Sequence, residues 1–78
     1  MEEFGIQVVV IVSANAEWDA VLRYFQSPTV QTSPFGTYFI TPLAGREVVL
    51  FQGGWGKISA AASAQYVVDR WHPKLVVN

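Results

Sequence analysis

Near its start the chain reads Gly5-Ile6-Gln7-Val8-Val9-Val10-Ile11-Val12, a stretch that is almost entirely apolar and rich in β-branched residues. A strand with one face in water alternates polar and apolar residues, whereas an unbroken apolar run is typical of a strand buried on both faces. Such strands are found inside parallel sheets, where helices cover both sides. Residues 5–12 therefore predict an inner strand of an α/β fold.

A helix is expected after this strand, over about residues 16–26. The preceding Ser13-Ala14-Asn15 offers side chains that can cap a helix, and Pro28 closes it. The apolar positions within it recur at i, i+3, i+4 and i+7, so they form one face directed at the sheet. These positions are Trp18, Val21, Leu22 and Phe25.

The rest of the chain predicts a hairpin, a second helix and a last strand. Strand-like runs at residues 37–41 and 47–51 flank Ala44-Gly45 as the turn, with Pro42 limiting the first strand. A helix over about residues 57–71 ends before His72-Pro73, and residues 75–77 form a short strand. The expected order is β-α-β-β-α-β.

Ligands gather at the carboxyl ends of strands in such sheets. In this chain those ends are Ser13-Ala14-Asn15, residues 53–56 and Asn78.

Composition excludes several classes of protein. The formal net charge is −1 and the basic residues are scattered, so we expect no nucleic-acid partner. The longest apolar run is far shorter than the roughly 20 residues that cross a bilayer, and the acidic start does not resemble a secretory signal. One histidine and no cysteine give no metal constellation, so no metal and no cofactor are expected. The absence of cysteine fits a cytoplasmic protein.

Length and composition together indicate that the chain does not stand alone. Its 78 residues are 51% hydrophobic and only 14% charged, against about 25% charged in an average domain. A domain this small buries only about 60–65% of its unfolded surface. Either the chain oligomerises or it is one part of a larger fold, and we favour the second.

The glycine-rich turn Gly53-Gly54-Trp55-Gly56-Lys57 matches neither common nucleotide motif. A P-loop needs glycine where Phe51 stands and Ser or Thr where Ile58 stands. A dinucleotide fingerprint needs glycine in place of Ser59, after a strand that opens a β-α-β unit rather than one in a hairpin. Two interpretations stay open. The glycines permit a tight turn, or they let the backbone approach a ligand with Trp55 against it.

Four segments in order resemble a known family. Gly54-Trp55-Gly56-Lys57-Ile58-Ser59-Ala60-Ala61, then Gln65 and Pro73-Lys74-Leu75-Val76-Val77-Asn78, are similar to the Gly-x-Gly-Lys-apolar-x-Ala-Ala…Pro-x-apolar-apolar-apolar-Asn segment of the nucleoside phosphorylase superfamily. The opening strand with Ser13-Ala14-Asn15-Ala16-Glu17 and the hairpin with Gly45-Arg46 agree in order and spacing. The branch resembled most is that of 5′-methylthioadenosine/S-adenosylhomocysteine nucleosidase.

This resemblance implies a fold and a domain. Residues 1–78 are expected to be the N-terminal β-α-β-β-α-β portion of a single three-layer, phosphorylase/hydrolase-like α/β domain with a central mixed sheet, cut after Asn78. The family's ribose-binding Met-Glu segment and the Asp that protonates the purine would follow later. The chain alone is therefore expected to be inactive, and the full-length protein to be a cytoplasmic homodimer acting on a small-molecule nucleoside.

The resemblance also implies an activity and its residues. Nucleosidases of this branch use a Glu in the loop after the first strand to activate water, and Glu17 takes that place when Ser13 is aligned with the family's small residue. A register centred on Ala14 would put Trp18 there instead. On residues alone, the favoured interpretation of Glu17 is a helix-start carboxylate stabilised by the helix dipole. The substrate-binding residues implied are Ser13, Ala14, Gly54, Trp55, Gly56 and Asn78.

Three functions stay open at this point. The leading one is hydrolysis of the N-glycosidic bond of an adenine nucleoside such as methylthioadenosine. Phosphorolysis is less favoured because the first loop lacks the arginine of the phosphorylases, Arg23 being more than a helical turn away and Arg46 lying in a turn. The third is a non-catalytic module that keeps the nucleoside-binding scaffold.

Overall fold

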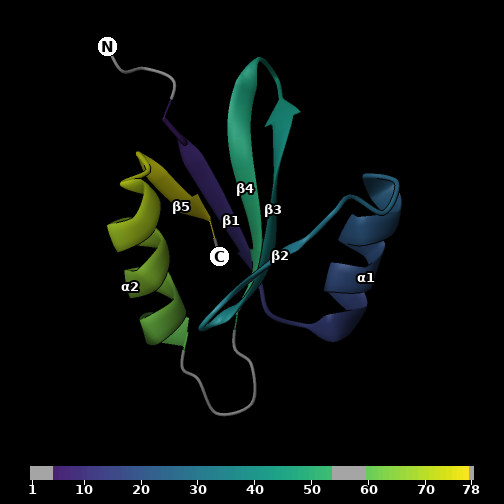
Figure 1. The fold of residues 1–78 in the computed structure, drawn as a ribbon, viewed down its shortest axis with the longest axis horizontal. Coiled ribbons are helices and arrows are strands. Elements are labelled where there is room, and N and C mark those ends of the chain that lie inside the picture. The colour runs from purple at the N-terminus through teal and green to yellow at the C-terminus, as the bar shows by residue number, and fades with distance from the viewer. Residues whose placement is uncertain (1–4, 54–59, 78) are drawn as a thin grey trace.

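The computed structural model of the chain describes residues 5–53 and 60–77. Within these ranges a five-stranded mixed sheet has the strand order β2-β3-β4-β1-β5, with a helix on each face (Figure 1). The predicted α/β class with a central mixed sheet is confirmed. The elements are β1 (Val8–Val12), α1 (Asn15–Tyr24), β2 (Gln31–Ser33), β3 (Gly36–Leu43), β4 (Arg46–Gln52), α2 (Ala60–Trp71) and β5 (Leu75–Val77).

Strand β1 lies between β4 and β5 and is parallel to both. Its side chains alternate between two covered faces, and Val9 and Ile11 are almost completely buried. The prediction of an inner strand from residues 5–12 is confirmed, although the strand begins at Val8. The residue before it, Gln7, uses its carbonyl oxygen to accept bonds from the amides of Lys74 and Leu75 at 2.9 and 3.2 Å.

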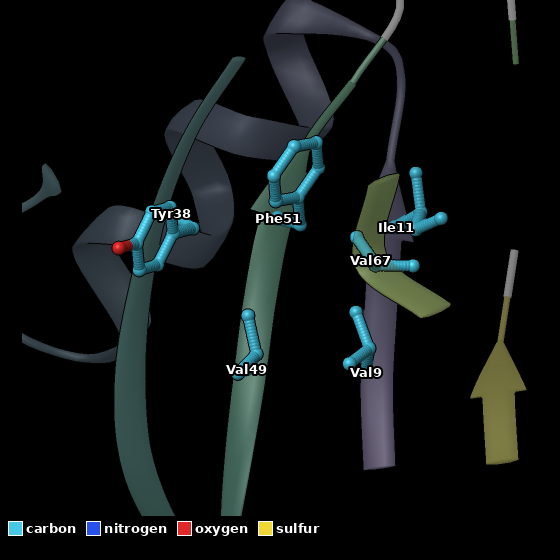
Figure 2. Close-up of a cluster of buried hydrophobic side chains, with 6 residues drawn as sticks. All are labelled: Val9, Ile11, Tyr38, Val49, Phe51 and Val67. Atoms are coloured by element: carbon cyan, nitrogen blue, oxygen red, sulfur yellow. The ribbon is translucent and has the colours of Figure 1, made fainter. Parts of the chain in front are cut away.

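The two faces of the sheet carry separate apolar clusters. Trp18 of α1 packs on one face with Phe39, Val48 and Leu50, and its ring centroid lies 5.7 Å from that of Phe39. The predicted apolar face of the first helix is thereby confirmed. Helix α2 covers the opposite face, where Figure 2 shows its Val67 close to the side chains of the inner strands. The buried members of this second cluster are Val9, Ile11, Tyr38, Val49, Phe51 and Val67.

The predicted order of elements was wrong by one strand. The structure adds β2, which pairs antiparallel with β3 from Gln31↔Tyr38 to Ser33↔Gly36. Its sequence, Gln31-Thr32-Ser33, has no apolar run, so periodicity gives no sign of it. Backbone pairing with the free edge of β3 makes it a strand, and the Ser33 hydroxyl closes the turn by donating to the Gly36 carbonyl at 2.7 Å.

The hairpin turn was predicted correctly, but the limit at Pro42 was not. Ala44 and Gly45 join the pair Leu43↔Arg46 in a two-residue turn, and both have positive φ. Strand β3 nevertheless continues through Pro42, which pairs with Glu47. Strand β2 reaches only as far as Tyr38, so in the described residues the other edge of β3 is unpaired at Pro42, and an edge position tolerates a residue without an N–H.

Three further expectations need adjustment. Helix α1 ends at Tyr24 rather than at residue 26, because Gln26 and Ser27 have positive φ. Helix α2 ends at Trp71 as predicted, while residues 57–59 of the predicted helix lie outside the described residues.

Strand β4 belongs to the hairpin and also opens a β-α-β unit, since α2 connects it to β5 across β1. A dinucleotide fingerprint is therefore excluded by Ser59 alone, which stands where that motif needs glycine.

Candidate functional site

The carboxyl ends of β1, β4 and β5 lie at the same end of the sheet, because the three strands are parallel. Val12 pairs with Gln52, and the Gly53 amide donates to the Val12 carbonyl oxygen at 3.2 Å. In Figure 1 this edge is at the bottom of the sheet, where α1 begins. Open α/β sheets bind ligands at such an edge, so we take it as the candidate site.

Three predicted site residues come together at this edge. Ser13 and Ala14 form the short exposed connection between β1 and α1, and Glu17 is exposed in the first turn of α1. Trp18, the next residue, is only 5% exposed and packs in the core. Glu17 is therefore the one of these two neighbours that solvent and a ligand can reach. The predicted binding residues Gly54, Trp55, Gly56 and Asn78 lie outside the described residues.

The predicted capping of the first helix was wrong. The N-cap residue is Ala14, and no side chain caps the helix there. Asn15 has instead entered the helix as its first residue, and its side chain points to the sheet. Its Oδ1 accepts a hydrogen bond of 2.9 Å from Nε2 of Gln52, the last residue of β4.

Gln52 was missed by the sequence analysis. Its Oε1 accepts a longer bond of 3.4 Å from the Thr37 hydroxyl, so the amide links β3 to the start of α1. The side chain is 9% exposed, and a polar group that is buried this far needs hydrogen-bond partners. A signal was present in the sequence, because a glutamine follows directly on the apolar run of β4.

Gly53 supports the structural interpretation of the first glycine in the turn. A Cβ built there would lie 2.8 Å from Oγ of the buried Ser63 and 3.3 Å from Cγ2 of Ile11. A larger residue at this position would force the side chain of Ser63, in helix α2, to shift. This packing requirement needs no ligand to explain it.

The described residues place the basic groups away from this edge. Arg23 lies in the last turn of α1, about 12 Å along the helix from its start at 1.5 Å per residue. Arg46 is the first residue of β4, about 20 Å along the strand from Gln52. Within residues 5–53 and 60–77 no group of His, Asp and Glu is arranged to hold a metal ion. In the same ranges, neither helix is long and apolar enough to cross a membrane.

Comparison with curated proteins identifies relatives. The chain is 39% identical over 41 residues to the 5′-methylthioadenosine/S-adenosylhomocysteine nucleosidase of Listeria innocua, covering 53% of this chain and 18% of the relative. The nucleosidase of Listeria monocytogenes serotype 4b is 34% identical over 65% of this chain and 23% of its own length. That of Marinomonas sp. is 27% identical over 94% of this chain and 32% of its own length.

No family model matches the chain, and no solved structure matches it significantly. The α/β fold and the curated matches are both consistent with the resemblance of the chain to the nucleoside phosphorylase superfamily. Within that superfamily, the relatives just named are all 5′-methylthioadenosine/S-adenosylhomocysteine nucleosidases. The chain corresponds to less than a third of the length of these three proteins.

Proposed function

We propose that the protein containing this chain hydrolyses the N-glycosidic bond of an adenine nucleoside such as methylthioadenosine, and that Glu17 activates the attacking water. One observation carries the proposal. A chain that matches nucleosidases over up to 94% of its length has an exposed carboxylate, Glu17, next to the carboxyl ends of β1 and β4. We further propose that residues 1–78 form the N-terminal part of the catalytic domain.

The chemistry of the reaction fits a carboxylate at this place. The oxygen of water forms a bond to the anomeric carbon as the carbon–nitrogen bond breaks, and the transition state has oxocarbenium character. Glu17 takes the proton from water and stabilises the developing positive charge. The electron pair of the broken bond goes to the purine, which leaves after an acid from the rest of the protein protonates it. The products are adenine and the free sugar.

Hydrolysis is favoured over phosphorolysis by the positions of the arginines. A phosphate nucleophile carries about two negative charges near pH 7 and needs cationic partners. Arg23 and Arg46 both lie far from the carboxyl edge, at the other end of α1 and at the other end of β4. Product analysis distinguishes the two reactions. Hydrolysis yields the free sugar with or without added phosphate, whereas phosphorolysis requires phosphate and yields a sugar phosphate.

The variant Glu17→Gln tests the role of the carboxylate in the full-length protein. The amide keeps the size of the side chain but cannot accept the proton, so we expect turnover of methylthioadenosine to fall by about 10²- to 10⁴-fold. Adenine release, followed by absorbance or chromatography, measures it. Asp19→Asn is the matched control, because Asp19 is an exposed carboxylate on the same helix, and it should keep wild-type turnover.

Unchanged turnover in Glu17→Gln would refute the assignment of this residue. A wild-type protein that binds an adenine nucleoside without releasing adenine would instead support the non-catalytic module.

The resemblance also leads us to propose a cytoplasmic homodimer. Cell fractionation and sedimentation velocity of the full-length protein test these two points.

A further inference from the structure

Helix α1 begins without the usual side-chain cap. Its N-cap residue, Ala14, has no side chain that can bond to the free amides, and the first backbone bond runs from the Trp18 amide to the Ala14 carbonyl at 2.9 Å. A helix start of this kind frays easily, since a missing cap costs about 1 kcal/mol. Here the bond from Gln52 Nε2 to Asn15 Oδ1 attaches the first helical residue to the sheet.

Gln52 is held in one orientation by its surroundings. It follows Val48 and Leu50 on the face of β4 that α1 covers, so its side chain extends the same row toward the start of the helix. The Thr37 hydroxyl donates to Oε1, and Thr37 lies directly opposite Gln52 in the β3–β4 pair. With the oxygen occupied by β3, the amide NH₂ faces Asn15. The result is a continuous link from β3 through β4 to the first residue of α1.

We infer that Gln52 and Asn15 are positioning residues for Glu17, an inference that rests on the function proposed above. Glu17 lies two residues after Asn15, in the same uncapped turn. Its carboxylate must stay within hydrogen-bond reach of the attacking water, and a displacement of about 1 Å can cost on the order of 100-fold in rate. By holding the backbone of this turn against the sheet, the link fixes the point from which the Glu17 side chain reaches the substrate.

The variant Asn15→Ala tests this inference in the full-length protein. Asn15 is exposed, and alanine is a good helix former, so the variant loses the acceptor for Gln52 without opening the core. We expect kcat for adenine release to fall by about 10- to 100-fold while KM changes by less than about threefold. Asn15→Asp keeps an acceptor oxygen at the same place and should retain kcat within about threefold of wild type.

The matched control removes a similar bond elsewhere. Gln65 Nε2 donates to Asp69 Oδ1 at 3.0 Å on the exposed face of α2, so Gln65→Ala breaks a hydrogen bond of similar length, also donated by a side-chain amide, away from the site. It should leave kcat and KM unchanged. Loss of activity in Asn15→Ala alone then reports on the link and not on hydrogen-bond loss in general.

Hydrogen exchange gives a second measurement that does not depend on turnover. The Trp18 amide closes the first turn of α1, and fraying of that turn exposes it to solvent. In Asn15→Ala we expect this amide to exchange about tenfold faster, with amides of α2 unaffected. Asn15→Asp and Gln65→Ala should both show the wild-type rate at Trp18.

The outcomes separate this inference from the proposed function. Wild-type kcat in Asn15→Ala, in a protein that Glu17→Gln inactivates, would overturn the positioning role and leave the nucleosidase assignment intact. Unchanged exchange at Trp18 would overturn it as well. A wild-type protein that releases no adenine would refute the proposed function first, and the catalytic role of the link with it.

Discussion

Gly36 lies where β3 passes the end of β4, at a point that leaves no room for a side chain. A Cβ at this position would clash with the carbonyl oxygen of Gln52, and it would also contact the ring of Phe51. The strand cannot easily move aside, because the Ser33 hydroxyl accepts bonds from the amides of Phe35 and Gly36. Gln52, at this close approach, is also the residue that links the sheet to α1.

We therefore expect Gly36→Ala to lower the free energy of unfolding by about 1–3 kcal/mol, the usual cost of overpacking. The midpoint of urea denaturation measures the change. Gly5→Ala is the control, because a Cβ at Gly5 has nothing within 4 Å, and its effect should be within about 0.5 kcal/mol. Equal stability of the two variants would contradict the close approach of β3 and β4.

The roles of neighbouring residues in α1 could be read from spacing. Trp18 was placed on the apolar face and is buried against Phe39, which leaves Glu17 exposed at the start of the helix. The partner of Asn15 could not be read in this way. Gln52 is 37 residues further along the chain, and no local pattern records which glutamine a given asparagine will meet.

At the scale of elements, the β3–β4 hairpin turn contains a residue that is poorly suited to its conformation. Ala44 has φ 54° and Gly45 has φ 80°, the pair of positive values that a two-residue type I′ turn requires. Alanine in the left-handed region costs about 1–2 kcal/mol because its Cβ crowds the following carbonyl. Asparagine tolerates this conformation much better, and Asn-Gly is the preferred sequence for the turn.

Ala44→Asn should accordingly raise the free energy of unfolding by about 0.5–1 kcal/mol. Thermal or chemical denaturation measures the change. Gly45→Ala puts a Cβ at the second positive φ and should act in the opposite direction, by about 1 kcal/mol. A neutral or destabilising Ala44→Asn would show that the turn relaxes to another type in solution.

The element that the sequence analysis missed, β2, shows the limit of periodicity. A strand with one buried face is recognised by its alternating polar and apolar residues. Gln31-Thr32-Ser33 is polar throughout, and only Ser33 is buried. Its strand conformation depends on hydrogen bonds to β3 and on the turn that the Ser33 hydroxyl closes. These are properties of the pair and not of the three residues.

At the scale of the whole molecule, the described residues form one sheet with a helix on each face. Part of a candidate site lies at the carboxyl ends of the parallel strands. The described residues hold three carboxylates besides Glu17. Asp19 is exposed on α1 two residues after Glu17, Glu47 pairs with Pro42 near the hairpin turn, and Asp69 lies near the far end of α2. The resemblance implies that the acid for the leaving purine is an Asp later in the protein, and we propose that none of these three carboxylates takes its place.

We therefore expect residues 1–78 alone to release no adenine from methylthioadenosine. The physical reason is that hydrolysis of this bond needs both a base for water and an acid for the leaving group. Assay of the 78-residue chain beside the full-length protein, at equal concentration, checks this. Turnover by the short chain above the uncatalysed rate would mean that residues 1–78 already contain an acid that protonates the purine.

The sequence by itself determined the α/β class, both helices, the inner strand and the hairpin turn, because each follows from a local period or from turn chemistry. The tertiary structure alone decided the rest. Register placed Val12 beside Gln52 and so brought Gly53 and the start of α1 to one edge. The extra strand, the uncapped helix and the link between Asn15 and Gln52 all depend on contacts between segments distant in sequence, which residue spacing does not encode.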